Sequence, residues 1–373
     1  MLRKRTLVFA ALVVCVVGCG IYVFSTGKQR NPMNFPTIAK GVISPIIREP
    51  VHETPVQNVD TMSIVKEPDT VPPIPKDSPI TKHSNDSTKL ATPASLSSDV
   101  TIVTAFFDIG KFQKGDGSLY FTPDLYHTWM KVFGKIQNPV VFYFETDRDV
   151  TFMRNLRKDL DPSLTKIVQL NRTRMWSFGD VRERISDIFR QPSYPKHHPN
   201  TVVPEYSCAM HAKYEVMNRT AYENPFKTKY FAWLDIGLFR ELKQSSPFRL
   251  TLPPNFDQTK VAYTEVYPRS QRTATQIFHD NLVWVCGCFF IAEGSVMTSW
   301  VHEYIKATEL FLDHGVMNTD QQIIMSMFVA DNFGFRPRTQ LQLYKGDGRF
   351  NEWFHLGYVC KDEGDRKSRQ SMK

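Results

Sequence analysis

The chain has 373 residues, of which 42% are hydrophobic, so it is long enough and apolar enough to contain a large folded domain. Its formal net charge is +8. Seven of these charges lie at the two ends, because five basic residues fall between positions 3 and 30 and a net two between positions 361 and 373. The remainder is close to neutral, which argues against a phosphate-binding face, and we expect no nucleic-acid partner.

An uncharged apolar run at residues 7–24 follows the basic residues Arg3, Lys4 and Arg5. About twenty such residues are enough to span a bilayer, whereas the apolar core of a cleaved signal peptide usually has about 7–15. We therefore predict a transmembrane signal-anchor at 7–24. Residues 1–6 are the cytoplasmic tail of a single-pass type II membrane protein, because a basic flank stays in the cytosol. A cleaved signal peptide is the alternative.

Residues 25–99 are rich in proline, serine, threonine and lysine and nearly free of aromatic residues. Such a segment cannot bury enough apolar surface to fold. We predict a disordered stem that holds a lumenal domain, residues 100–360, away from the membrane, and a charged tail at 361–373. Three candidate N-glycosylation triplets fit a Golgi or ER lumen, although such triplets also occur by chance.

From residue 100 onward, apolar strand patterns alternate with helical patterns. In chain order we predict strand 101–107, a helix opening at Thr122-Pro123-Asp124, strand 140–144, helix 149–160 and strand 166–170. Alternation of this kind predicts an α/β Rossmann-type domain, in which a mostly parallel sheet has helices on both faces. Ligands bind beyond the carboxyl ends of such strands, and Asp108 lies at one of them.

Helical spacing reappears in the segment 208–222, where Tyr214 and Met217 lie on one face. We assign this face to the core. The opposite face carries His211 and Lys213, and we expect the Lys213 side chain to be solvated. Lys213 has the alternative role of reaching a phosphate group.

The apolar stretch 230–234 reads as a buried strand, and it runs directly into Asp235. An ionised carboxylate is costly to bury without a partner. Asp235 therefore indicates a bound cation, a cationic neighbour, or a turn in which its side chain accepts a backbone N–H before Gly237. The sequence leaves these three alternatives open.

A further strand at 288–292 is followed by a helix whose apolar residues repeat every three or four positions. The next helix opens at Thr319, which forms a capping box with Gln322. Asp320 then lies in the first turn, where the helix dipole favours a carboxylate. This local explanation accounts for the motif without catalysis.

Four cysteines lie outside the apolar N-terminal run, at positions 208, 286, 288 and 360. An oxidising compartment would favour at least one disulfide among them. Cys286 and Cys288 point the same way if they lie on a strand, so we expect each to pair elsewhere rather than with the other.

Three segments, 101–110, 233–237 and Asp320-Gln321, resemble the HtrL/YibB family, which is glycosyltransferase-like. The order of motifs, ending in Trp353-Phe-His355-Leu-Gly357, is also similar to glycosyltransferases of the GT-A type. The resemblance implies a single GT-A-like domain with a nucleotide-sugar donor and a glycan or glycoprotein acceptor. It implies functional positions at Asp235, Gly237, Asp320 and Gln321, with Asp108 on the nucleotide side.

In GT-A enzymes an acidic motif binds a divalent metal on the donor diphosphate, and in several families a late histidine completes the coordination. The resemblance thus implies Mn²⁺ or Mg²⁺ held by Asp235 and His355. The usual motif has two acids one residue apart, but Gly237 occupies the second position here. Either one carboxylate suffices, with help from His355 or Asp108, or the domain uses no metal.

Two hypotheses follow. The first is a type II membrane glycosyltransferase in which Asp320 is the general base of an inverting transfer. Lys213, Gly237, Gln321 and Asp108 would then contact the donor. The alternative is a non-catalytic lumenal protein of the same fold that binds a glycan or nucleotide, and the missing second acid favours it.

Overall fold

The computed structural model describes residues 97–242, 246–269 and 271–371. The predicted tail 1–6, the anchor 7–24 and nearly all of the stem lie outside these ranges. Within them, no helix has both the length and the apolar character needed to cross a membrane.

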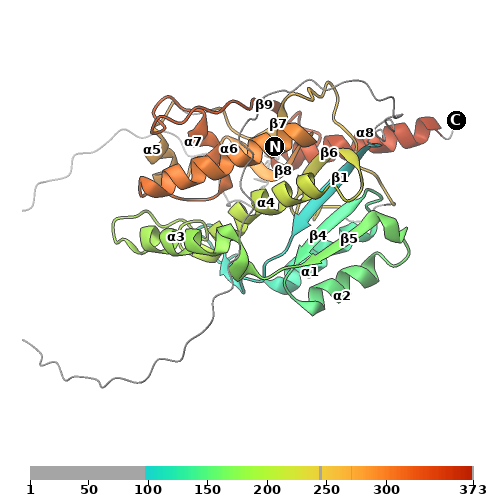
Figure 1. The fold of residues 1–373 in the computed structure, drawn as a ribbon, viewed down its shortest axis with the longest axis horizontal. Helices are drawn as coiled ribbons and strands as arrows, with labels where there is room; N and C mark the ends of the chain where they lie inside the picture. The colour runs from blue at the N-terminus through green and yellow to red at the C-terminus, as the bar shows by residue number, and fades with distance from the viewer. Residues whose placement is uncertain (1–96, 243–245, 270, 372–373) are drawn as a thin grey trace, which may run out of the picture. The chain divides into compact units, whose positions relative to one another are not determined.

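A seven-stranded sheet forms the centre of the domain (Figure 1). Its strands are, in spatial order, β5 (Thr165–Gln169), β4 (Val140–Phe144), β1 (Ser97–Ala105), β6 (Thr228–Leu234), β8 (Val285–Glu293), β7 (Val261–Glu265) and β9 (Leu341–Lys345). The first four run parallel, β8 is antiparallel to both of its neighbours, and β9 is parallel to β7. The predicted mostly parallel sheet of an α/β domain is confirmed.

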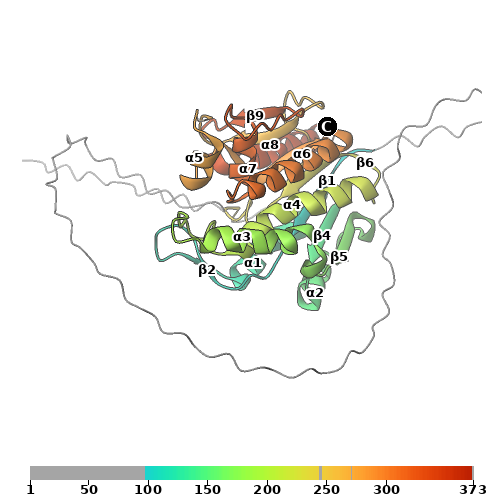
Figure 2. The ribbon, with the colours of Figure 1, turned by 60° about the vertical axis from the view of Figure 1, so that its left-hand side comes forward.

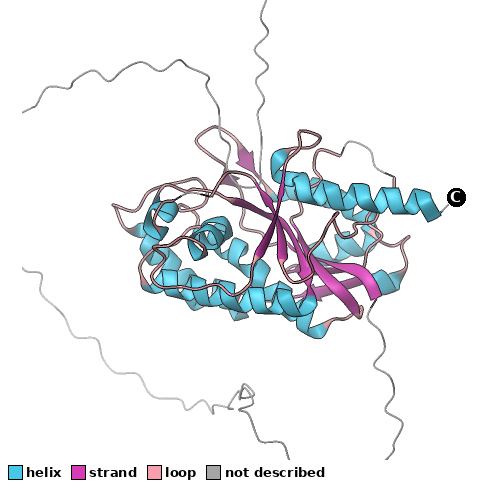
Figure 3. Cartoon of the chain, turned by 90° about the horizontal axis from the view of Figure 1, so that it is seen from above, coloured by secondary structure: helices cyan, strands magenta, loops and turns pink. Residues whose placement is uncertain are grey.

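Helices cover both faces of this sheet (Figures 2 and 3). One face packs against α3 (Asp180–Arg190), α4 (Pro204–Glu223), α5 (Ala274–His279), α6 (Gly294–Asp313) and α7 (Asp320–Met327). The other packs against α1 (Pro123–Met130), α2 (Asp147–Leu156) and α8 (His355–Ser371). A short hairpin, β2 (Phe112–Gln113) and β3 (Tyr120–Phe121), follows β1. The described part of the chain also contains short 3₁₀ helices, which are η1 (Lys131–Gly134), η2 (Pro162–Leu164), η3 (Arg172–Arg174), η4 (Trp176–Phe178) and η5 (Glu352–Phe354).

The end of β1 differs from the prediction in a way that shapes the site. The strand ends at Ala105 rather than at residue 107. Phe106 still donates a backbone hydrogen bond to Tyr143 of β4, but its side chain and that of Phe107 lie beyond the sheet edge and line a cavity. Two large apolar side chains thus lie where a ligand of such a sheet would bind.

The prediction that the Lys213 side chain is solvated is wrong, and His211 on the same face is also buried. Both side chains are buried, because α4 lies between the sheet and the helices α3, α6 and α7. Figure 2 shows α4 and α6 side by side. The apolar face of α6 does follow the predicted spacing, since Trp300 and Tyr304 are fully buried. A helix covered on both sides buries its polar residues as well as its apolar ones.

The helix starts follow local capping chemistry. Thr122 accepts a hydrogen bond from the backbone of Leu125 and starts α1, as predicted. The capping box between Thr319 and Gln322 also forms. At the C-terminus, α8 continues to Ser371, so most of the predicted charged tail is helical.

Arg157 is a buried cation that joins the edge of the sheet to η1. Its guanidinium donates to the carbonyl oxygens of Phe133 and Ile136 at 2.7 and 2.8 Å and to Thr165 Oγ1 at 2.8 Å. Burial lowers the pKa of Arg157 to about 10, which leaves it charged at neutral pH. Several backbone carbonyls therefore depend on one side chain for their hydrogen bonds.

We predict that Arg157→Ala lowers the free energy of unfolding by about 3 kcal/mol or more, because it leaves buried carbonyl groups unpaired. Urea denaturation measures this change. Arg154→Ala removes an exposed arginine from the last turn of α2, next to the C-cap residue Arg157, and is the matched control, with an expected change within about 0.5 kcal/mol. Equal stabilities for the two variants would contradict the prediction.

Candidate functional site

A cavity lies where the order of the strands reverses. The chain runs outward from β1 through β4 to β5 and then returns to β6 on the other side of β1. Open α/β sheets bind ligands at such a switch point, beyond the carboxyl ends of the strands. The cavity at this point, here called the β1/β6 cavity, has mainly aromatic walls that include Phe106, Phe121, Tyr126, Trp129, Tyr206 and Trp233. Lys213, Asp235 and Arg240 are its charged lining residues.

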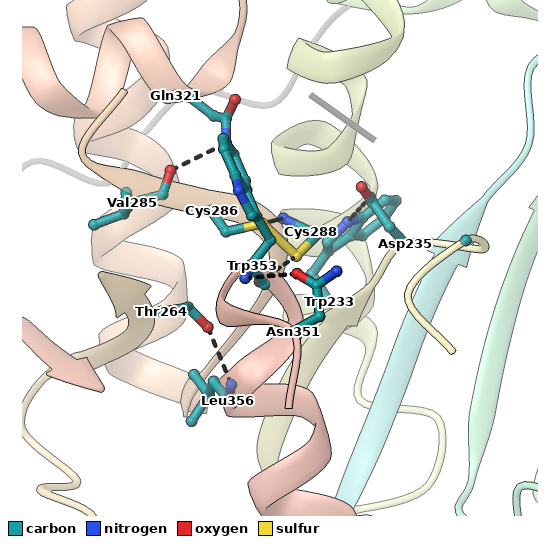
Figure 4. Close-up of a disulfide and its surroundings, with 12 residues drawn as sticks. Trp233, Asp235, Thr264, Val285, Cys286, Cys288, Gln321, Asn351, Trp353 and Leu356 are labelled. Carbon is teal, nitrogen blue, oxygen red and sulfur yellow. Dashed lines mark hydrogen bonds between the residues drawn. A yellow bond between two sulfur atoms is a disulfide. The ribbon is translucent and has the colours of Figure 1, made fainter. Parts of the chain in front are cut away.

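Asp235 reaches this cavity from the end of β6 with one carboxylate oxygen already bonded. Its Oδ1 accepts a hydrogen bond from Trp233 Nε1 at 2.6 Å (Figure 4). The same oxygen lies 3.2 Å from Lys213 Nζ. The side chain is 21% exposed. Of the three alternatives for this residue, the structure shows the cationic neighbour.

Lys213 joins three elements through a single ammonium group. Its side chain comes from α4 and is only 1% exposed. Besides Asp235, the ammonium lies 3.2 Å from Asp320 Oδ2 and donates to the carbonyl oxygen of Gly287 at 3.1 Å. An ammonium has three N–H groups, and these three oxygens match that number. The orientation of Asp235 thus depends on contacts to β8 and α7.

Asp320 lies behind Lys213 and does not line the β1/β6 cavity. Its side chain is fully buried, and its Oδ1 has no hydrogen-bond partner. Burial raises the pKa of Asp320, and the charge of Lys213 opposes this effect. Lys213 is thus the counter-charge that Asp235 and Asp320 share. Asp320, the predicted general base, is therefore separated from any ligand in the cavity by Lys213.

Gly287 explains how Asp320 can approach β8 so closely. A Cβ atom at this position would lie 2.1 Å from Asp320 Oδ2. No side chain fits there, and glycine in a buried strand often marks such a close approach. This contact was not predicted from the sequence, although an isolated glycine within an apolar strand is a signal that could have indicated it.

The other predicted site residues divide between the cavity and its surroundings. Gly237 lines the cavity beside Trp129. Asp108 is exposed and accepts a hydrogen bond from the backbone of Gly110 at 2.9 Å, in a turn next to the cavity. Gln321 is buried and donates to the carbonyl oxygen of Val285 at 3.1 Å, away from the cavity (Figure 4).

The structure does not bring His355 to Asp235. His355 begins α8, is 4% exposed, and has its Nδ1 3.8 Å from Asp347 Oδ1. Burial lowers its pKa. It is not among the residues that line the β1/β6 cavity. The two predicted metal ligands therefore do not form one site.

The residues around Asp235 do not fit a divalent cation. Among the described parts of the chain, no group of three or more His, Cys, Asp and Glu residues is arranged to hold a metal ion. Mn²⁺ and Mg²⁺ need several oxygen ligands. Here Asp235 Oδ1 already accepts from an indole N–H and faces an ammonium, which would repel a second cation.

Cys286 and Cys288 form a disulfide with each other (Figure 4). The expectation that each pairs elsewhere is therefore wrong. Cα atoms two residues apart in a straight strand are about 6.6 Å apart, but these two are 5.4 Å apart. The register of β7 against β8 shifts at Thr264, opposite Cys286, and this irregularity shortens the strand locally. Cys208 and Cys360 are buried and unpaired.

A buried polar network lies next to Lys213 on α4. His211 Nδ1 lies 2.6 Å from the hydroxyl of Tyr304, and His211 Nε2 lies 3.3 Å from Ser207 Oγ. Burial lowers the pKa of His211 to about 3, so the ring is neutral in the folded protein. The network supports the helix that positions Lys213.

Comparison with known proteins identifies relatives of most of the described chain. A family model described as "Bacterial protein of unknown function (HtrL_YibB)" matches residues 98–354. Protein HtrL of Escherichia coli (strain K12) is 21% identical over 282 residues, which cover 70% of this chain and 92% of that protein.

Some solved structures share parts of the arrangement at low similarity. Mouse xyloside xylosyltransferase 1, in its apo form, has 9% identity and a TM-score of 0.31 over 66% of this chain and 84% of its own. Core-mannan synthase A from Aspergillus fumigatus, in an Mn/GDP form, has 8% identity and a TM-score of 0.34 over 68% and 74%. The mannosyltransferase Ktr4p from S. cerevisiae has 10% identity and a TM-score of 0.35 over 68% and 70%.

We predict that Gly287→Ala lowers the free energy of unfolding by about 2–4 kcal/mol, because the new methyl group displaces Asp320 from Lys213. Gly117→Ala is the matched control, since a Cβ there meets nothing within 4 Å. Urea denaturation of both variants checks the difference. A Gly287→Ala protein as stable as the control would show that the contact with Asp320 is not tight.

We also predict a pH dependence that originates at His211. The unfolded chain takes up a proton near pH 6.5, whereas folded His211 resists protonation down to about pH 3. Stability is therefore present above pH 6.5 and is lost as the pH falls toward 3, by about 2–3 kcal/mol between about pH 6.5 and 4.5. Denaturation at several pH values measures this slope. His211→Gln should flatten it, and an unchanged slope would contradict the assignment.

Proposed function

This chain belongs to the HtrL_YibB family, whose function is unknown, and we propose that it is a glycosyltransferase that moves a sugar from a nucleotide-sugar donor to a glycan or glycoprotein acceptor. The observation that carries this proposal is the β1/β6 cavity, which is largely aromatic and contains one fixed carboxylate at the switch point of the sheet. Apolar pockets with a few convergent polar groups are the usual form of small-molecule sites.

The chemistry of the walls suits such a ligand. Aromatic faces such as those of Trp129 and Tyr126 offer stacking surfaces for a sugar ring or a base. The charge of Arg240 favours the anionic diphosphate of the donor. Asp108, in the exposed turn beside the cavity, is the proposed contact to the nucleotide.

Asp235 is the carboxylate that such a ligand would meet. Lys213 and Trp233 fix its Oδ1, so that the group is oriented before the ligand binds. In a transfer, the acceptor hydroxyl oxygen bonds to the anomeric carbon, the bond to the diphosphate breaks, and the hydroxyl proton passes to a base. We assign the role of proton acceptor or hydroxyl contact to Asp235. Asp320 then has no contact with the ligand and acts on Asp235 only through Lys213.

A non-catalytic binding protein of the same fold is the second candidate. The observation in its favour is that Lys213 neutralises Asp235, while Gly237 takes the place of a second acid. A neutralised carboxylate is a good hydrogen-bond acceptor but a weak base. Both candidates bind a ligand in the same cavity, but only the glycosyltransferase converts it to a product.

The proposed setting is a single-pass type II membrane protein with its domain in the Golgi or ER lumen. Its support is the apolar run at 7–24 between basic flanks, together with the composition of the stem.

We predict that the purified chain binds at least one member of a panel of nucleotide sugars and releases the nucleoside diphosphate. Asp235→Asn should lower this rate about 100-fold or more without a change in fold. Calorimetry measures binding, and phosphate-coupled assays measure release, each with and without Mn²⁺. Asp124→Asn, at an exposed acid on α1, is the matched control. Binding without release selects the second candidate, and no binding to any member contradicts both.

A further inference from the structure

Three oxygen atoms from three different elements converge on Lys213 Nζ. They are Asp235 Oδ1 after β6, Asp320 Oδ2 on α7 and the carbonyl oxygen of Gly287 on β8, at 3.2, 3.2 and 3.1 Å. We propose that this is a cation site that the protein fills with its own ammonium group, so that the β1/β6 cavity is electrostatically complete without a divalent metal.

The oxygen set is of the kind that hard divalent cations bind. Two carboxylates and a backbone carbonyl are typical ligands of Mg²⁺, Mn²⁺ and Ca²⁺. In this chain the same kinds of atoms surround a buried side chain that carries one positive charge and three hydrogen-bond donors. Lysine therefore does here what a metal ion would otherwise do, which is to bring two carboxylates together.

The groups that surround Lys213 Nζ are held close to one another by several restraints. Gly287 has no side chain, and a Cβ there would overlap Asp320. The disulfide between Cys286 and Cys288 encloses the same glycine and restrains the backbone on either side of its carbonyl group. Asp320 is held in the first turn of α7 by the capping box. These restraints fix the three oxygens around one point.

A divalent cation and the ammonium cannot share this position. A metal bound to Asp235 Oδ1 would lie within a few ångströms of Lys213 Nζ, at a site that burial shields from water. Removal of the ammonium would reverse the situation, because two carboxylates would then face an empty volume without a counter-charge. Lys213→Ala should convert the ammonium site into a metal site.

The test is thermal unfolding of the full chain with EDTA and with Mn²⁺. We expect the Tm of the wild-type protein to be the same in both. Lys213→Ala should have a lower Tm in EDTA and should recover about 5 °C at a Mn²⁺ concentration about a hundredfold above its Kd. A Mn²⁺-dependent rise in the wild-type Tm that Asp235→Asn abolishes would overturn the proposal. So would a folded Lys213→Ala protein that does not respond to Mn²⁺.

Two controls make the result specific. Lys306→Ala removes an exposed lysine from α6 and should show no response to Mn²⁺. Lys213→Ala combined with Asp320→Asn removes one of the two carboxylates and should lose most of the recovery. If neither Lys213→Ala nor Lys213→Met folds, titration of wild-type protein with Mn²⁺ followed by electron paramagnetic resonance decides. Mn²⁺ bound at Asp235 then refutes the proposal, and free Mn²⁺ supports it.

The inference has a consequence for ligand binding, and this consequence rests on the proposed function. A nucleotide sugar should bind equally well in EDTA and in Mn²⁺. Binding that requires Mn²⁺ would overturn the inference and leave the proposed glycosyltransferase in place. Absence of binding under both conditions would overturn the proposed function, and the Tm measurements would still decide whether Lys213 replaces a metal.

Discussion

The contact of Lys213 with two carboxylates and a carbonyl is the interaction on which the site depends. It links α4, β6, β8 and α7 at one buried point, although the lysine and Asp320 are 107 residues apart in the chain. A buried charge is stable only when its partners are in place, so the position of each element constrains the other three. Asp235 is oriented by this arrangement rather than by its own turn. The orientation of the carboxylate in the β1/β6 cavity thus depends on contacts made across the α4 face of the sheet.

The aromatic side and the charged side of the cavity come from different parts of the chain. Phe106, Tyr126 and Trp129 come from the end of β1 and from α1, whereas Lys213 and Asp235 come from α4 and β6. The first group supplies contact area and the second supplies a few fixed polar atoms. Such a division suits a ligand with an apolar ring face and a charged or hydroxylated edge.

Residue patterns within a single segment predicted the strands and helices whose formation depends on that segment alone. Strand β4 occupies residues 140–144 as predicted, because a short run of β-branched and aromatic residues favours a buried strand. The starts of α1 and α7 followed from capping residues. Contacts over long distances in sequence were beyond such patterns. The spacing of Tyr214 and Met217 showed which face of α4 is apolar, but it could not show that further helices cover Lys213. The disulfide between Cys286 and Cys288 depended on an irregularity in a partner strand, which no pattern within β8 reveals.

Because β8 runs antiparallel to β6, the beginning of β8 lies at the same edge of the sheet as the end of β6, where a ligand would bind. Its neighbour β6 reaches the cavity at its last residues, but β8 reaches it at Cys288, close to its first. The first half of β8 therefore reaches the same edge as the turns that leave β1 and β6: Cys288 lines the cavity and the carbonyl group of Gly287 accepts from Lys213. A chimaera that exchanges only the outgoing turns would leave these two contributions of β8 unchanged.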